Sequence, residues 1–254
     1  MIELIEPDWP APANIRAFCT TRVGGASEGA YASLNLAEHV GDDPGAVERN
    51  RTLLAGLLPS DTEIQWLTQV HGNGVVRAPT EAAATADACW TDTPGVATAV
   101  LTADCLPVLF CNHEGTLVAA AHAGWRGLAS GVLEATVAAL PVPAEELLAW
   151  LGPAIGAGAY EVGPEVRAAF LAAAESGGTT SKSDVTSAFA PSKSRESHFF
   201  ADLYRLAGLR LEDAGVRYIH GGKHCTFTEE SRFFSYRRDG QTGRMASLIC
   251  INPV

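Results

Sequence analysis

Short apolar runs alternate with helical patterns along the whole chain. Several of these runs are continuous rather than alternating, which is typical of strands that are covered on both faces. The pattern predicts strands over Ile15–Thr20, Glu63–Val70, Ala97–Thr102, Pro107–Cys111, Leu117–His122, Leu147–Leu151, Val216–Ile219 and Ser247–Ile251. Strands this short and this numerous exclude a helical bundle.

Apolar residues at helical spacing predict helices between these strands, over Pro44–Leu57, Gly131–Leu140, Pro164–Ala174 and Leu203–Ala214. The first helix has a clear start signal, because Asp43 is placed to cap it and Pro44 suits the first helical position. The fold class is therefore expected to be α/β, of the mixed α+β kind.

One segment departs from this pattern. Residues 176–198 contain seven serines, two glycines and one proline, and little apolar content apart from Val185, Ala188, Phe189 and Ala190. This composition predicts a mobile loop. Such a loop is either a solvated insertion or a lid over an active site.

Composition and charge narrow the class of protein. The chain has 254 residues, of which 47% are hydrophobic, so it can bury a sizeable core and is not disordered. It lacks the long apolar run of a membrane helix, and its acidic, proline-broken start is unlike a signal peptide. We therefore expect a cytoplasmic protein that does not bind membranes. The net charge of −11 also argues against a nucleic-acid partner.

Three short polar motifs each follow a predicted strand. They are Gln69–Gly72, Thr102–Pro107 and Ala121–Gly127, and they contain His71, Cys105 and His122. Two imidazoles and a thiolate suit zinc, and three protein ligands leave a fourth position open, as in catalytic zinc sites. The six cysteines are scattered without a CxxC pair, so a metal or catalytic role for one of them fits better than disulfides.

Spacing alone leaves alternatives open for these residues. The three residues are 34 and 17 positions apart, which matches no compact zinc motif. The histidines could instead hydrogen-bond locally, with Cys105 as a small buried hydrophobe. A third possibility is a Cys–His nucleophile pair, with Asp104 or a histidine as the base.

Several arginines are candidates for binding an anionic substrate. Arg22 and Arg237 lie beside glycine turns, and Arg126 lies inside the His122 motif. An arginine next to a catalytic histidine is well placed to hold phosphate. The turn Gly152–Gly156 lacks the spacing of a dinucleotide or phosphate loop, and it is either a tight connection or part of a pocket wall.

Taken together, these motifs resemble those of the YfiH family, also named DUF152, multicopper polyphenol oxidase (laccase) or purine nucleoside phosphorylase. The resemblance runs from residue 20 to residue 244. Besides the three motifs above it rests on Thr20–Gly25, Ser33–Leu36, His39–Pro44, Asn50–Arg51, Gly152–Gly156, Tyr160–Val162 and Phe233–Asp239.

The resemblance implies a single YfiH-like domain over residues 1–254, built as a layered sandwich with mixed sheets and a zinc-centred active site. It implies that His71, Cys105 and His122 are the metal ligands, and it adds Asn35 to the candidates for substrate binding. The implied reaction is phosphorolysis of adenosine, inosine, guanosine and 5′-methylthioadenosine, with adenosine deamination beside it. The implied partners are thus a purine nucleoside and phosphate.

Other labels of the family imply other activities: a copper-dependent polyphenol oxidase, or an amidase that edits a serine-containing muropeptide precursor. With seven histidines and no HxH pair, a multicopper cluster is hard to build here, so zinc fits better than copper. A zinc site of this type also suits deamination of adenine. A binding module without catalysis would instead require a closed site with a fourth protein ligand.

Overall fold

The computed structural model describes residues 2–175 and 180–252 and contains two large stacked sheets. The five-stranded sheet consists of β1 (Leu4–Ile5), β2 (Ile15–Thr20), β16 (Met245–Ile251), β8 (Val96–Thr102) and β3 (Glu63–Gln65), in that order. The six-stranded sheet consists of β15 (Tyr218–Gly221), β11 (Leu147–Leu151), β9 (Leu106–Asn112), β10 (Val118–Ala123), β7 (Ala88–Thr91) and β5 (Val75–Arg77).

Two smaller sheets complete the β structure. One contains β12 (Glu161–Val162), β14 (Phe199–Ala201) and β13 (Phe189–Pro191), and the other pairs β4 (Leu67–Thr68) with β6 (Ala84–Thr85). The helices are α1 (Pro44–Ala55), α2 (Trp125–Ala129), α3 (Val132–Ala139), α4 (Pro164–Glu175), α5 (Lys182–Ser187), α6 (Leu203–Asp213) and α7 (Tyr236–Asp239). Short 3-10 turns occur at Gly29–Tyr31, Glu38–Val40 and Ala144–Glu146.

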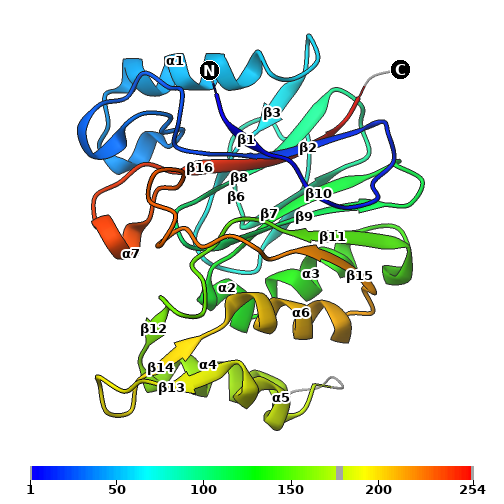
Figure 1. The fold of residues 1–254 in the computed structure, drawn as a ribbon. Helices are drawn as coiled ribbons and strands as arrows, with labels where there is room; N and C mark the ends of the chain where they lie inside the picture. Colours follow the sequence, from blue (N-terminus) through cyan, green and yellow to red (C-terminus); the bar gives the residue numbers. More distant parts are fainter. Residues whose placement is uncertain (1, 176–179, 253–254) are drawn as a thin grey trace.

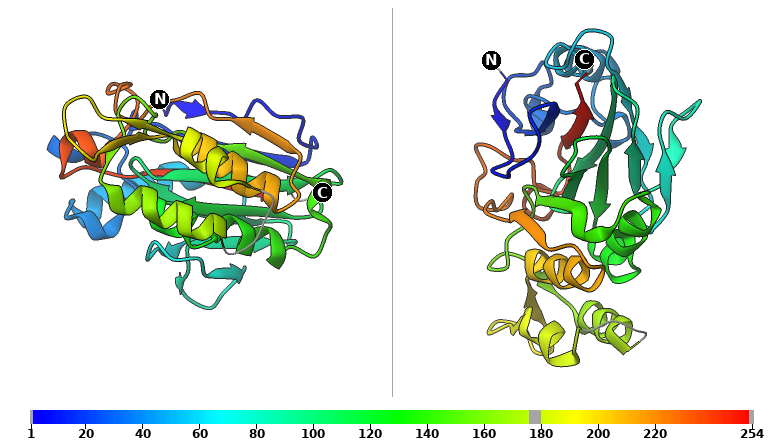
Figure 2. Two further views of the ribbon diagram at one scale, coloured as in Figure 1. Left: turned by 90° about the horizontal axis from the view of Figure 1, so that it is seen from below. Right: turned by 90° about the vertical axis from the view of Figure 1, so that its right-hand side faces the viewer.

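These elements form layers (Figure 1). Helix α1 lies above the five-stranded sheet, and α3 and α6 lie beneath the six-stranded sheet. The small sheet of β12, β13 and β14 forms the far end together with α4 and α5, as the side view in Figure 2 also shows. The mixed α/β class and the layered arrangement of mixed sheets that the sequence predicts are confirmed.

The continuous apolar runs arise because both faces of the central strands are covered. In β16, Leu248 and Cys250 pack toward α1, whereas Met245 and Ile249 pack between the two large sheets. Every residue of β16 is buried. A strand that buries both faces favours apolar side chains at nearly every position, which removes the alternating pattern of a half-exposed strand.

The predicted helices are all present, with ends within two residues of the prediction. The predicted cap is also present, because the Asp43 carboxylate accepts a hydrogen bond from the Ala46 N–H at 2.9 Å. The expected strand over Glu63–Val70 is wrong, because it divides into β3 and β4. These two strands pair with different partners, β8 and β6, so the chain changes sheets at Trp66.

The expected loop over residues 176–198 needs a larger correction. Residues 176–179 lie outside the described residues, but the rest contains α5 and β13. Ser181 caps α5 in a reciprocal pair of hydrogen bonds with Asp184, and the side chains of Val185 and Phe189 are buried. The serines that suggested an irregular loop therefore act in part as helix-capping groups.

In the part of the chain that the structure describes, no helix is both long and apolar enough to cross a membrane. All six cysteines are free.

Asn50 fastens the long loop before α1 to the helix itself. Its amide nitrogen donates to the Ser27 hydroxyl at 2.9 Å and to the Asn35 carbonyl at 2.8 Å, and its amide oxygen accepts from the Ala26 N–H at 2.7 Å. The side chain is fully buried. We expect Asn50→Ala to lower the free energy of unfolding by about 3 kcal/mol, because buried partners lose their hydrogen bonds. Urea unfolding measures this.

The adjacent residue supplies the control for that prediction. Arg49 is exposed, and its ion-pair partner among the described residues is Asp43, at 3.7 Å. Arg49→Ala should therefore change the free energy of unfolding by less than about 0.5 kcal/mol. Equal effects of the two substitutions would contradict the structural role of Asn50.

Candidate metal centre

Three strand ends bring His71, Cys105 and His122 together. His71 lies in the turn after β4, Cys105 immediately precedes β9, and His122 lies near the end of β10. Their ligand atoms all lie within 4.8 Å of one another, and His71 Nε2 is 4.0 Å from the Cys105 sulfur. The two imidazole rings meet edge to face, at 81°. These three residues form a group that could hold a metal ion, and the described part of the chain adds no fourth member to it.

A buried carboxylate, Asp87, holds two of these residues in place. Its Oδ1 accepts from the His71 N–H at 2.9 Å and faces His122 Nδ1 at 2.8 Å. Its Oδ2 accepts from the backbone N–H groups of Val70 and Gly72. The turn around His71 is thus wrapped around one carboxylate, which explains how His71 can keep a φ of 60°.

Asp87 also determines which nitrogen of His122 is free. Because Nδ1 faces the carboxylate, Nε2 is the nitrogen left for a ligand, as in the carboxylate–histidine–metal arrangement of many sites. Sequence analysis missed Asp87. The only signal was a single carboxylate among alanines just before a strand, and such a residue has no motif of its own.

The charges of Cys105 and His122 stabilise each other. Burial raises the pKa of the Cys105 thiol, but the two nearby histidines outweigh burial and lower that pKa to about 6. Burial lowers the pKa of His122, but Cys105 and Asp87 outweigh it and raise that pKa to about 9. The pair is therefore a thiolate beside an imidazolium, and a bound metal ion would take the place of the His122 proton.

The donor set fits a borderline divalent ion. Tetrahedral coordination by two nitrogens and one sulfur places the ligand atoms about 3.5 Å apart. The observed separations of up to 4.8 Å are only slightly larger, so small side-chain movements would close the group around an ion. The same geometry suits the alternative that the sequence left open, a Cys105–His122 nucleophile pair.

Asp104 has a partner for each of its carboxylate oxygens. Oδ1 accepts from the Thr226 hydroxyl at 2.6 Å, and Oδ2 accepts from the Arg237 backbone N–H at 2.7 Å. The residue has a φ of 90° and adjoins Cys105. These contacts tie the turn of Cys105 to the chain around β15 and α7, so Asp104 is better placed to position Cys105 than to serve as its base.

A pocket of about 690 Å³ opens onto the three candidate ligands. Its cations are Arg51 and Arg244, it also contains His39, and its aromatic walls are Trp66 and Tyr236. Arg244 lies close enough to Cys105 and Asp104 for their charges to interact with its guanidinium. In the sequence, His39, Arg51 and Tyr236 lie in motifs that carry the family resemblance, but none of the five was chosen as a site residue. Tyr236, which is 61% exposed, is the most accessible of the aromatic walls.

A second pocket, of about 480 Å³, also borders α7. Consecutive residues of α7 line the two pockets, Tyr236 the first and Arg237 the second. Arg126, a candidate for anion binding from the sequence, lines the second pocket. Tyr160, in its wall, has a raised pKa, first because it is buried and second because the charge of Cys105 lies close to it. We call this pocket the arginine compartment.

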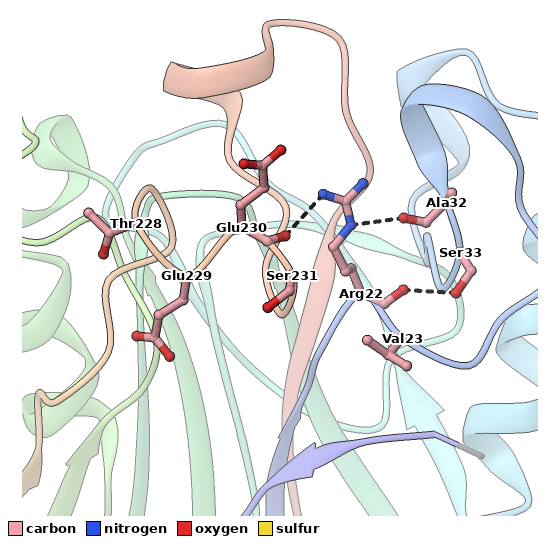
Figure 3. A pocket seen from close by; sticks show the side chains of 8 residues that line it. All are labelled: Arg22, Val23, Ala32, Ser33, Thr228, Glu229, Glu230 and Ser231. Carbon is pink, nitrogen blue, oxygen red and sulfur yellow. Dashed lines mark hydrogen bonds between the residues drawn. The ribbon is translucent and has the colours of Figure 1, made fainter.

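The other two candidates lie elsewhere. Arg22 lines a separate open pocket, where it donates to the carbonyls of Ala32 at 2.8 Å and Glu230 at 3.3 Å (Figure 3). Asn35 is fully buried. Its amide nitrogen donates to the Ala37 carbonyl and to the Asp42 carboxylate, and its amide oxygen accepts from the Arg244 N–H. Both residues therefore hold loops together, and Asn35 acts on the site only by fixing the backbone of Arg244.

Comparisons with known proteins agree with this fold. The family model described as multi-copper polyphenol oxidoreductase laccase matches residues 16–252. A Pseudomonas aeruginosa protein named purine nucleoside phosphorylase is 56% identical, over 96% of this chain and 97% of its own length. The Escherichia coli purine nucleoside phosphorylase YfiH is 52% identical, over 98% of this chain and 99% of its own.

Solved structures give the same result. A Neisseria meningitidis protein described as DUF152 is 51% identical and superimposes with a TM-score of 0.90, covering 98% of this chain and 99% of its own. YlmD from Geobacillus stearothermophilus is 33% identical with a TM-score of 0.84, covering 96% and 94%. The chain therefore belongs to the family that the matching model describes as multi-copper polyphenol oxidoreductase laccase, which is the YfiH (DUF152) family that its motifs resemble.

Proposed function

We propose that this protein is a zinc-dependent purine nucleoside phosphorylase that acts on adenosine, inosine, guanosine and 5′-methylthioadenosine. The observation that carries the proposal is the position of the His71–Cys105–His122 group, which opens onto a large pocket and adjoins an arginine compartment. The names of the relatives at 52–56% identity support the same reaction class.

The two pockets suit the two substrates. The larger has aromatic side chains, Trp66 and Tyr236, against which a flat purine can stack. The arginine compartment contains Arg126 and Arg237, whose guanidinium groups match the oxygens of phosphate. The guanidinium groups would hold the phosphate and neutralise its charge, which an acidic protein must do locally.

In phosphorolysis, a phosphate oxygen bonds to C1′ of the ribose as the bond from C1′ to the purine nitrogen breaks. The electron pair of that bond leaves with the purine, which takes up a proton. His71, Cys105 and His122 would hold zinc, which when bound supplies a Lewis acid with an open coordination position. Asp87 orients His122, and Asp104 positions both the Cys105 turn and the backbone of Arg237.

Adenosine deamination is a second activity that we propose for the same centre. Its support is the open group of two histidines and one cysteine, which shares its ligand types with the zinc deaminases, although those use one histidine and two cysteines or three cysteines. Deamination requires water but no phosphate, so the two reactions are separable.

The proposal predicts a phosphate-dependent reaction that Cys105 controls. With inosine and phosphate, the purified protein should release hypoxanthine and ribose-1-phosphate. Cys105→Ala should lower kcat/KM at least about 1,000-fold and remove most of the bound metal, because it deletes one of three metal ligands. Chromatography of the products and metal analysis per chain measure both effects.

The product pattern distinguishes the alternatives. Inosine formed from adenosine without phosphate indicates deamination. Serine released from a muropeptide precursor, with all four nucleosides left intact, would replace the proposal by the amidase. Oxidation of phenols only after copper loading would favour the oxidase. Cys225→Ala serves as the control, because Cys225 is also partly exposed but lies outside the candidate ligands.

A further inference from the structure

The serine-rich segment forms a hairpin whose tip is fastened beside the arginine compartment. β13 pairs with β14, with Pro191 opposite Phe199, and residues 192–198 join them. The hydroxyl groups of Ser192 and Ser194 donate to Glu161 Oε1 at 2.5 and 3.2 Å. Glu161 belongs to β12, the third strand of the same sheet, so the hairpin tip has a fixed position in the wall of the compartment.

The hairpin adds a third arginine to that wall. Arg126 stacks on Trp125 at 4.4 Å, and in the described part of the chain its guanidinium has no hydrogen-bond or ion-pair partner. Arg237 donates to the Glu161 carbonyl at 2.6 Å and leaves its other guanidinium nitrogens available. Arg195 lines the same compartment from the hairpin. The three cations thus come from three different elements.

One carboxylate engages Arg195 only weakly. Arg195 Nη1 lies 3.7 Å from Glu161 Oε2, which is too long for a hydrogen bond. Hydrogen bonds from Ser192 and Ser194 hold the pKa of Glu161 below its usual range, so the carboxylate is charged. Glu165 is the other carboxylate of the compartment, and His198 also lines it. Three guanidinium groups thus face two carboxylates.

We propose that Arg195 is a third phosphate-binding residue and that Glu161 competes with phosphate for it. This inference rests on the proposed function, because it assigns a further residue to the phosphate of that reaction. A phosphate dianion offers three acceptor oxygens and more charge than one carboxylate. Arg195 therefore turns from Glu161 to phosphate when phosphate enters, while Ser192 and Ser194 keep Glu161 in place.

Two substitutions should move the phosphate KM in opposite directions. Arg195→Gln should raise it about five-fold, a modest effect because the side chain is 62% exposed. Glu161→Gln should lower it about two-fold, because the amide oxygen still accepts from the serines but the competing charge is gone. The nucleoside KM should stay unchanged in both variants. Lys193→Gln is the matched control, since Lys193 is a cation of the same hairpin that does not line the compartment.

Phosphate binding without nucleoside separates this proposal from the reaction itself. Phosphate should raise the Tm of the wild-type protein relative to sodium chloride of equal ionic strength, and Arg195→Gln should reduce that increase. If no nucleoside is cleaved but this pattern holds, the reaction is wrong and the anion site stands. If Arg195→Gln and Lys193→Gln behave alike, or if Glu161→Gln raises the phosphate KM, the proposal is wrong.

Discussion

Replacing Asp87 by asparagine should weaken metal binding, although all three candidate ligands stay in place. The Asp87 carboxylate accepts from the backbone N–H groups of Val70, His71 and Gly72 and fixes Nδ1 of His122. An asparagine has only one acceptor oxygen, so its NH₂ group must face either two backbone donors or the ring nitrogen of His122. The turn of His71 and the orientation of His122 cannot both survive this change.

The expected size of the effect follows from the two roles of Asp87. Metal affinity should fall about 10- to 100-fold, the usual cost of removing a carboxylate that orients a ligating histidine. The free energy of unfolding should fall by about 3 kcal/mol, because buried donors lose a charged acceptor. Competition with a chelator of known affinity measures the first, and urea unfolding of the metal-free protein measures the second.

An exposed aspartate on a neighbouring segment provides the control. Asp92 pairs with Arg77 at 2.7 Å on the surface, so Asp92→Asn should change the free energy of unfolding by less than about 1 kcal/mol and leave metal affinity unchanged. If Asp87→Asn binds metal as tightly as Asp92→Asn does, then the carboxylate does not organise the centre.

Each of the three candidate ligands stands at the end of an apolar run, which singled them out in the sequence, and the family resemblance then implied that they hold a metal. Strand ends at one edge of a layered fold lie close together, so His71, Cys105 and His122 meet although 34 and 17 residues separate them. The continuous apolar runs also indicated the correct fold class, since strands covered on both faces carry apolar side chains at most positions.

The surroundings of these residues could not be found in the same way. Arg22, Arg126 and Arg237 look alike in sequence, yet the structure brings only the last two together. The Arg22 guanidinium donates to the carbonyl groups of Ala32 and Glu230, and no local sequence pattern indicates these partners. Composition likewise indicated a loop where Ser181 caps a helix and where Ser192 fastens a hairpin. The partners of Arg22 and Ser192 are distant in sequence, whereas the pairing of Ser181 with Asp184 is a local signal that composition alone does not reveal.

A substitution at Gly124 tests the centre without changing any candidate ligand or Asp87, the carboxylate that holds two of them. Its φ of −64° and ψ of 158° suit any residue, so the backbone does not require glycine there. The requirement is space. A Cβ at this position would lie 3.0 Å from the Cys105 sulfur and 3.0 Å from Cδ2 of His71. One methyl group would therefore press on two of the three candidate ligands.

We expect Gly124→Ala to fold and yet to lose its metal and its activity. Overpacking of this kind costs about 1–3 kcal/mol of stability, which most domains survive. Displacing His71 and Cys105 by a few tenths of an ångström should lower metal occupancy at least about 10-fold, because tetrahedral sites tolerate little change in ligand distance.

Gly208→Ala is the control. Gly208 lies on helix α6, and a Cβ there would meet nothing within 4 Å, so the variant should keep full metal occupancy and gain about 0.5–1 kcal/mol in the free energy of unfolding. Metal analysis and the phosphorolysis rate, measured on both variants, decide the matter: a fully loaded and active Gly124→Ala would mean that the reactive centre does not lie between His71 and Cys105.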